Sequence, residues 1–207
     1  MGRPPVLTPA RVGNVARHPR WLYGVLRHRR VSGRNLVAEG GFRAAVESVD
    51  IQTRELMQST LAWEDVAWIR DLWPGQLFIK GIGDARDARQ ALALGLDGVV
   101  VSNHGGRQLD GARASLDCLP EVVEAVGDRM EVLLDGGIRR GTDVVKALAL
   151  GARAVLIGRP YLYGLAVGGE DGVVSILDIF RQELERAMIL LGVSEVGDLG
   201  PDCLERR

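Results

Sequence analysis

A histidine and an arginine stand three residues apart in a glycine-rich stretch, a pairing that could remove a proton from a small acid. His104 is followed by Gly105, Gly106 and then Arg107. An imidazole can accept a proton near neutral pH, and a guanidinium can hold a carboxylate through two parallel hydrogen bonds. A lone histidine is more often structural, but this setting predicts a general base beside a carboxylate-binding group.

Two further glycine-rich stretches, residues 135–141 and 158–160, predict a site for a phosphate group. Glycine lets backbone N–H groups approach an anion closely, and a helix beginning after Gly141 would add the positive end of its dipole. Arg139 and Arg159 could each add a charge-assisted contact. The alternative is that both stretches are ordinary turns with surface arginines.

Lys80 is a further candidate, because it places a cation at the end of an apolar run. Such a cation could stabilise negative charge on a cofactor ring; the alternative is a strand end that reaches solvent. Cys118 and Cys203 show no metal-type spacing. We therefore expect no metal centre and no disulfide framework.

Four short apolar runs place these polar residues and are typical of strands buried on both faces, since they are continuous rather than alternating. They cover residues 76–81, 97–103, 131–137 and 154–159. Helical stretches lie between them: Asp84 caps the first, Pro120 opens the second, and Thr142 or Asp143 begins the third. Alternating strand and helix predicts an α/β fold with a parallel sheet. Function in such folds sits at the carboxyl ends of the strands, where all the stretches above fall.

The pentapeptide Ala-Leu-Ala-Leu-Gly occurs twice, at residues 91–95 and 147–151. Each copy closes a predicted helix and leads into a predicted strand, which suits a barrel built from repeated βα units. A final amphipathic helix is expected over residues 173–191 and ends at Gly192.

The N-terminal part of the chain is strongly basic, although the net charge of the whole chain is −1. Residues 1–38 hold eight arginines and no acidic residue, with apolar positions at helical spacing over residues 21–26. This segment is either a solvated surface helix or a basic amphipathic segment that touches anionic lipid or a partner. Nucleic acid is not expected as a partner, because no nucleic-acid module surrounds the basic run.

Four motifs in order are similar to those of the FMN-dependent α-hydroxy-acid oxidases and dehydrogenases, such as glycolate oxidase, lactate oxidase, L-lactate dehydrogenase and mandelate dehydrogenase. They are SNHGGRQLD (102–110), DGGIRRG (135–141), DVVKALALG (143–151) and GRP (158–160). The segment 68–74, followed by 79–81, looks closest to the lactate and mandelate dehydrogenases. The resemblance is strong over residues 60–200 and loose over residues 1–59.

The resemblance implies a (β/α)8 TIM barrel with FMN at its C-terminal mouth, which oxidises an L-lactate- or mandelate-like 2-hydroxy acid to the 2-oxo acid. It assigns His104 as the base, Arg107 as the carboxylate clamp and Lys80 as the stabiliser of reduced FMN. It places further cofactor contacts on Ser102, Asp135, Gly136, Gly137, Arg139, Gly158 and Arg159. The electron acceptor would be oxygen, a quinone or a cytochrome.

The predicted strands match the last four of that barrel, and 207 residues fall short of the roughly 250 of a closed barrel. We therefore expect a half barrel over residues 60–207, preceded by a basic segment over residues 1–59. It would be a homo-oligomer or pair with a missing N-terminal half. The alternative to an active enzyme is a catalytically inactive fragment that binds FMN phosphate or acts in assembly. We expect a cytoplasmic protein, with residues 11–35 available to touch the inner face of the membrane.

Overall fold

A computed structural model of the chain describes residues 8–28 and 61–205. The chain divides into two compact units, residues 1–61 and 62–207. Within the described ranges, no helix is both long enough and apolar enough to cross a membrane.

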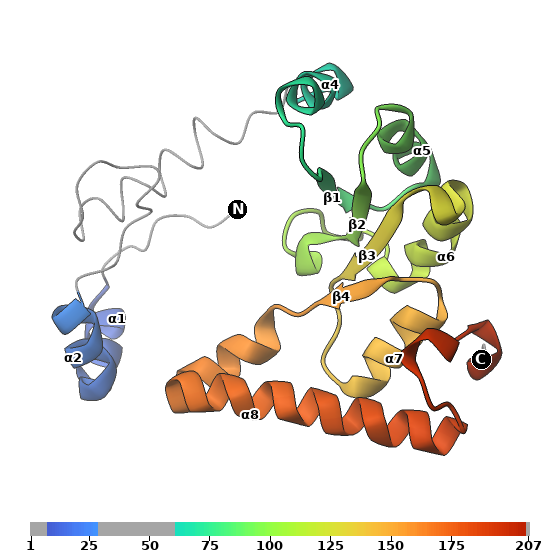
Figure 1. The fold of residues 1–207 in the computed structure, drawn as a ribbon. Helices are drawn as coiled ribbons and strands as arrows, with labels where there is room; N and C mark the ends of the chain where they lie inside the picture. The colour runs from blue at the N-terminus through green and yellow to red at the C-terminus, as the bar shows by residue number, and fades with distance from the viewer. Residues whose placement is uncertain (1–7, 29–60, 206–207) are drawn as a thin grey trace. The chain divides into compact units, whose positions relative to one another are not determined.

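The described residues of the first unit, 8–28, form helices in the basic segment (Figure 1). Helix α1 spans Pro9–Ala16 and α2 spans Pro19–His28. Thr8 caps α1 by accepting a hydrogen bond from the Arg11 amide, at 3.3 Å. Helix α2 exposes its large apolar side chains, with Trp21 58%, Tyr23 64% and Leu26 63% accessible. The expected helical character is confirmed over these residues, while residues 29–35 lie outside the described ranges.

The second unit is built on a parallel sheet whose strands follow one another in chain order (Figure 1). Within residues 61–205 the strands are β1 (Phe78–Ile82), β2 (Gly98–Ser102), β3 (Glu131–Asp135) and β4 (Ala154–Leu156). Each pairs in parallel with the next. The predicted parallel sheet is thus confirmed. Strand β2 lies inside the sheet and all five of its residues are buried, as its continuous apolar run indicated.

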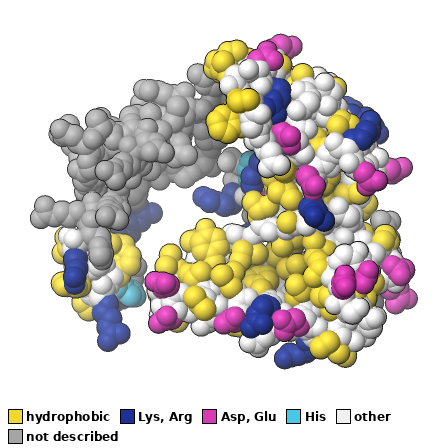
Figure 2. Space-filling model, viewed as in Figure 1, with side chains coloured by type: hydrophobic (Ala, Val, Ile, Leu, Met, Phe, Trp, Pro, Cys, Tyr) yellow, Lys and Arg dark blue, Asp and Glu magenta, His cyan; other side chains and the backbone are white. Residues whose placement is uncertain are grey.

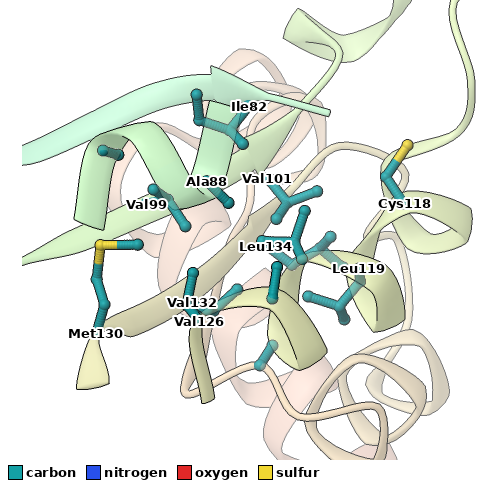
Figure 3. Close-up of a cluster of buried hydrophobic side chains, with 14 of the residues drawn as sticks. Ile82, Ala88, Val99, Val101, Cys118, Leu119, Val126, Met130, Val132 and Leu134 are labelled. Atoms are coloured by element: carbon teal, nitrogen blue, oxygen red, sulfur yellow. The ribbon is translucent and has the colours of Figure 1, made fainter. Parts of the chain in front are cut away.

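Helices connect these strands and cover one face of the sheet (Figure 1). Helix α4 (Trp63–Leu72) precedes β1, and α5 (Ala85–Ala93), α6 (Ser115–Val126) and α7 (Gly141–Ala149) follow β1, β2 and β3. The main core lies between the sheet and these helices (Figure 3). It contains Ala88, Val99, Val101, Leu119, Val126, Val132 and Leu134, among others. Because side chains alternate along a strand, Lys80, Ser102 and Asp135 lie on the opposite face.

The helix boundaries follow the sequence signals in part. Asp84 caps α5 as predicted, accepting from the Arg86 amide at 2.6 Å. The predicted start of α6 at Pro120 is wrong, because the helix begins at Ser115 and Pro120 lies inside it. Proline is favoured in a first helical turn, but Pro120 lies in the second turn, where α6 forms without the hydrogen bond that a backbone N–H at this position would donate.

Helix α8 is longer than predicted and starts after a two-residue connection from β4. It spans Arg159–Leu191 and is interrupted at Gly169, which has φ 62° and ψ −137°. It ends at Gly192 in the left-handed conformation, as expected. The helix packs on α7, and a Cβ at Gly141 would collide with the backbone of Leu184. This close approach explains why α7 begins with a glycine.

One broad apolar surface of this unit remains open. Figure 2 shows hydrophobic side chains gathered over α8 and the strands beside it. The exposed large residues of α8 include Tyr163 at 65% and Leu165 at 50%. In addition, β1 and β4 are the edges of the described sheet. An open apolar surface and free edge strands are both expected of a barrel of which only part is present, because a closed barrel has no edge strands.

Truncating the core beneath the sheet should have a large effect on stability. Leu119 of α6 is fully buried, so Leu119→Ala is expected to lower the free energy of unfolding by about 2–5 kcal/mol. Urea unfolding followed by circular dichroism measures this change. The matched control is Leu190→Ala, because Leu190 is 81% exposed and should shift stability by no more than about 0.5 kcal/mol. Equal losses in the two variants would contradict the described core.

Candidate active site

Three of the predicted site residues meet at the carboxyl edge of the sheet, on the face away from the main core. Lys80 comes from β1, Ser102 ends β2 and Asp135 ends β3. The Lys80 ammonium donates to Ser102 Oγ at 3.0 Å and lies 2.8 Å from Asp135 Oδ2. Ser102 Oγ donates to the same carboxylate oxygen at 2.6 Å. The network fixes a cation and a carboxylate side by side.

The charge state of this network follows from its contacts. Partial burial raises the pKa of the Asp135 carboxyl, but hydrogen bonds from Lys80 and Ser102 and the charge of Lys80 outweigh it. The pKa of Asp135 therefore lies below its ordinary value. An ammonium has three N–H donors, and the two contacts above leave Lys80 one for a ligand. Its side chain is 41% exposed, so that donor can be reached.

This lowered pKa predicts a pH dependence of stability. Because the folded pKa of Asp135 lies below the unfolded value of about 3.9, its contribution is fully present above that pH. The contribution is lost as pH falls through the folded pKa. Asp135→Asn should therefore flatten the acid side of a curve of melting temperature against pH. Asp178→Asn, which removes an exposed carboxylate on α8, is the control, and an equal change in both variants would contradict the prediction.

His104 lies beside this network in an unusual backbone conformation. It follows β2 closely, its φ is +56°, and among described residues no other non-glycine has a positive φ. Its amide donates to Ser102 Oγ at 3.0 Å. The imidazole lies against Gly81, where an added Cβ would be 2.8 Å from Nε2. A side chain at position 81 would displace the ring, so this glycine makes room for the candidate base.

Arg107 follows the His104 turn and is exposed to solvent. In the part of the chain that the structure describes, its guanidinium has no hydrogen bond or ion pair. The turn between them consists of Gly105 and Gly106, both with left-handed φ values of 68° and 72°. Among the described residues, Arg107 thus carries a guanidinium without a protein partner three positions after His104, and this leaves it available to an anionic ligand.

The two glycine-rich stretches lie after β3 and β4, at the same edge of the sheet as the His104 turn. Gly137 has a φ of +82°, and neither it nor Gly158 has a neighbour within 4 Å of an added Cβ. Arg139 and Arg159 are exposed. Arg159 also donates from Nη2 to the Gly105 carbonyl at 3.1 Å. This contact ties the segment after β4 to the His104 turn.

The start of α7 differs from the expected phosphate site. The amides of Arg139 and Arg140 both donate to Asp143 Oδ2 at 3.0 Å. The Gly141 amide donates to Glu183 of α8 at 2.9 Å. The N-terminal donors expected to face an anion are therefore satisfied by carboxylates of the chain itself. Helix α8 starts after Gly158 without a side-chain cap, so its first amides suit an anion better.

Two residues of this region carry contacts that the sequence reasoning missed. Asn103 precedes His104, and its side chain accepts from the Gly106 amide at 3.2 Å. Ser115 begins α6 and accepts from the Asn103 amide at 3.0 Å. An asparagine just before a glycine-rich turn and a serine at a helix start are both recognised local signals. Neither signal shows that the two residues meet.

The fold is a partial α/β barrel, and the candidate site lies at the carboxyl ends of its strands. The open glycine backbone, Arg139, Arg159 and the free donor of Lys80 suit a ligand with a phosphate and a polar ring. The profile of the FMN-dependent dehydrogenase family matches residues 1–206. The chain belongs to this family, whose cofactor is FMN, and the residues present fit that cofactor.

Individual relatives give the extent of the match. The chain is 41% identical to an L-lactate dehydrogenase of Pseudomonas aeruginosa over 204 residues, which covers 98% of this chain and 53% of the relative. It is 56% identical to an L-lactate oxidase of Nostoc sp. over 148 residues, covering 72% of this chain and 40% of that protein.

Solved structures agree with the partial barrel. The crystal structure of an (S)-mandelate dehydrogenase, described as a monotopic membrane protein, matches with a TM-score of 0.90 at 39% identity. The match covers 100% of this chain and 54% of that one. The chain thus spans about half the length, or less, of the proteins it matches. The expected half of a TIM-type barrel is confirmed.

Proposed function

We propose that the protein oxidises a small 2-hydroxy acid, L-lactate- or mandelate-like, to the 2-oxo acid with FMN as cofactor. The observation that carries this proposal is the placement of His104 against Gly81, next to the Lys80–Ser102–Asp135 network. Arg107 follows the His104 turn and is unpaired among the described residues. The names of the relatives, a lactate dehydrogenase, a lactate oxidase and a mandelate dehydrogenase, support the substrate class.

Different residues at this edge of the sheet would contact different parts of the cofactor. Gly137, Arg139, Gly158 and Arg159 would hold the phosphate, with Gly136 shaping the loop, and Ser102 and Asp135 would contact the rest of the cofactor. The free N–H of Lys80 would stabilise negative charge at the ring. FMN, when bound, supplies the acceptor for two electrons.

The substrate would be handled by the other two residues. Arg107 would bind the carboxylate through paired hydrogen bonds and so orient the hydroxyl-bearing carbon. Oxidation of a 2-hydroxy acid to a 2-oxo acid releases protons, and His104 would take up one of them as general base. The neighbouring Asp135 carboxylate is already paired with Lys80, which leaves the imidazole as the base of the site.

Anaerobic bleaching of the bound flavin tests this function. The purified protein is loaded with FMN, its visible spectrum is recorded, and L-lactate or mandelate is added. Bleaching supports the enzyme, and reoxidation by oxygen, a quinone or a cytochrome then identifies the acceptor. Bound flavin that no hydroxy acid bleaches favours the alternative, a fragment that binds cofactor without catalysis. No bound flavin, even with added FMN, would rule out activity of this chain alone.

We also propose that the open half barrel pairs with a second half, either another copy or a chain that supplies the remaining strands. The support is the pair of edge strands, β1 and β4, and the exposed apolar side chains of α8. Open sheet edges and large apolar patches favour association. Light scattering measures the oligomeric state, and thermal unfolding measures cooperativity. A monomer that melts cooperatively would contradict this proposal.

A peripheral contact with the inner face of the membrane is proposed for residues 11–35. Helix α2 exposes Trp21, Tyr23 and Leu26 beside arginines, a composition suited to an anionic lipid surface. The mandelate dehydrogenase that the chain resembles is a monotopic membrane protein. Sedimentation with phosphatidylglycerol vesicles should show salt-sensitive binding that Trp21→Ser weakens. Equal binding to zwitterionic vesicles would contradict the proposed attraction between the arginines and anionic lipid.

A further inference from the structure

The turn that carries His104 is held by a pair of residues that lie outside the candidate cofactor and substrate contacts. Asn103 uses both ends of its side chain: Oδ1 accepts from the Gly106 amide at 3.2 Å, and Nδ2 donates to the Arg113 carbonyl at 3.2 Å. Its carbonyl also accepts from the Gly106 amide, at 3.0 Å. Asn103 therefore holds both ends of the turn over residues 104–106, because it precedes His104 and bonds the Gly106 amide.

Ser115 holds the backbone of Asn103 through a hydrogen bond. It is 4% exposed, one of two buried polar residues in the described part of the chain. Its hydroxyl accepts from the Asn103 amide at 3.0 Å. Because Ser115 is the first residue of α6, the turn is anchored to a helix of the main core rather than to another loop.

The same pair contacts the loop after β3. A Cβ at Gly136 would lie 3.0 Å from Ser115 Oγ and 3.1 Å from Asn103 Oδ1. Gly136 adopts a φ of +104°, and it directly follows Asp135. The Asn103–Ser115 pair thus lies between the turn that carries the candidate base and the loop that carries candidate phosphate contacts.

His104 needs such support. Residues 104, 105 and 106 all have positive φ. Glycine adopts this conformation freely, whereas for the histidine it costs free energy. A disfavoured conformation persists only where the surrounding contacts determine it. On the His104 amide the contact is the Ser102 hydroxyl, and on the Gly106 amide it is the side chain and carbonyl of Asn103. Arg159 adds a contact to the Gly105 carbonyl from the segment after β4.

We propose that Asn103 and Ser115 are positioning residues that hold His104 in its left-handed conformation and tie its turn to the loop at residues 136–137. Neither side chain contacts His104 Nε2 or the Arg107 guanidinium: Asn103 acts on the turn that carries His104, and Ser115 acts through Asn103. The proposal rests on the proposed function, because it assumes that the imidazole must be aimed at a substrate. A misplacement of about 1 Å at a catalytic group costs on the order of 100-fold in rate.

Nuclear magnetic resonance tests the positioning without any catalysis. In the parent protein, the His104 ring should give a cross-peak with the Gly81 Hα protons, because the ring lies against that glycine. Asn103→Ala should lose this cross-peak, whereas Asn103→Asp keeps an acceptor for the Gly106 amide and should retain it. Ser115→Ala should weaken it. The matched control is Ser175→Ala, which removes a hydroxyl bonded to the Asp171 carbonyl within α8.

Kinetics of the FMN-loaded protein give the second readout. Asn103→Ala should slow flavin reduction by about 10- to 100-fold, with the Kd for FMN changed less than about threefold, and Asn103→Asp should restore most of the rate. A lower melting temperature with an unchanged cross-peak and rate would overturn the proposal and leave a purely structural role. If the parent protein is not reduced by any hydroxy acid, the proposed function fails, while the cross-peaks still decide whether the pair positions His104. If Asn103→Ala does not fold, the comparison of Asn103→Asp with Ser115→Ala decides it.

Discussion

Replacing His104 with alanine is expected to slow flavin reduction by a hydroxy acid by about 10²- to 10⁴-fold, while FMN stays bound. The substitution removes the proton acceptor but leaves the Lys80–Ser102–Asp135 network complete, because His104 bonds Ser102 through its backbone amide and not through its ring. Stopped-flow absorbance under anaerobic conditions measures the reduction rate, and flavin fluorescence measures retention of the cofactor.

Two variants separate the loss of the base from a disturbed turn. His104→Asn removes the imidazole with a residue that tolerates the left-handed conformation well, so it should be as slow as His104→Ala. His18→Ala, at a histidine bonded to the Asn14 carbonyl between α1 and α2, should reduce at the parent rate. If either His104 variant reduces within a few-fold of the parent, the assignment of the base is wrong.

Replacing Arg107 with methionine should weaken binding of the hydroxy acid by about 100-fold, because charge-assisted hydrogen bonds to the carboxylate are lost. Arg107 makes no hydrogen bond or ion pair with the described residues of the chain, so the melting temperature and the Kd for FMN should not change. The measurement is the substrate concentration that gives half-maximal reduction rate. Arg107→Lys should recover only part of the affinity, since an ammonium lacks the planar two-donor geometry.

The matched control for this prediction is Arg181→Met. Arg181 lies on α8 in exposed ion pairs with Asp178 and Glu185, which contribute little. It should leave the concentration dependence unchanged. An equal effect of both substitutions would indicate a general loss of positive charge rather than a carboxylate clamp at Arg107.

Local signals were sufficient for most of the fold. The apolar runs ending in glycine or polar residues located β1 to β4, and Asp84 was recognisable as a cap from its own sequence context. The common edge of the site also followed, because all parallel strands present their carboxyl ends on the same side. Lys80, Ser102 and Asp135 could therefore be expected to meet, as they do.

Contacts between distant residues could not be predicted in the same way. Glu183, from the far part of α8, accepts from the Gly141 amide and so changes what the start of α7 can bind. No local pattern connects these two positions. The start of α6 was misplaced because Pro120 is a strong local signal, whereas Ser115 is fixed by its contact with Asn103 in another loop.

The order of the strands has a consequence for how the protein forms. Each strand pairs with the one that precedes it in the chain, so a strand finds its partner already made as soon as it leaves the ribosome. Because the entropy cost of closing a loop grows with its length, pairing between successive strands costs less than pairing between more distant segments. The proposed site is the exception: Arg159, the last of its candidate residues, follows β4, so these residues can come together only after β4 has been synthesised.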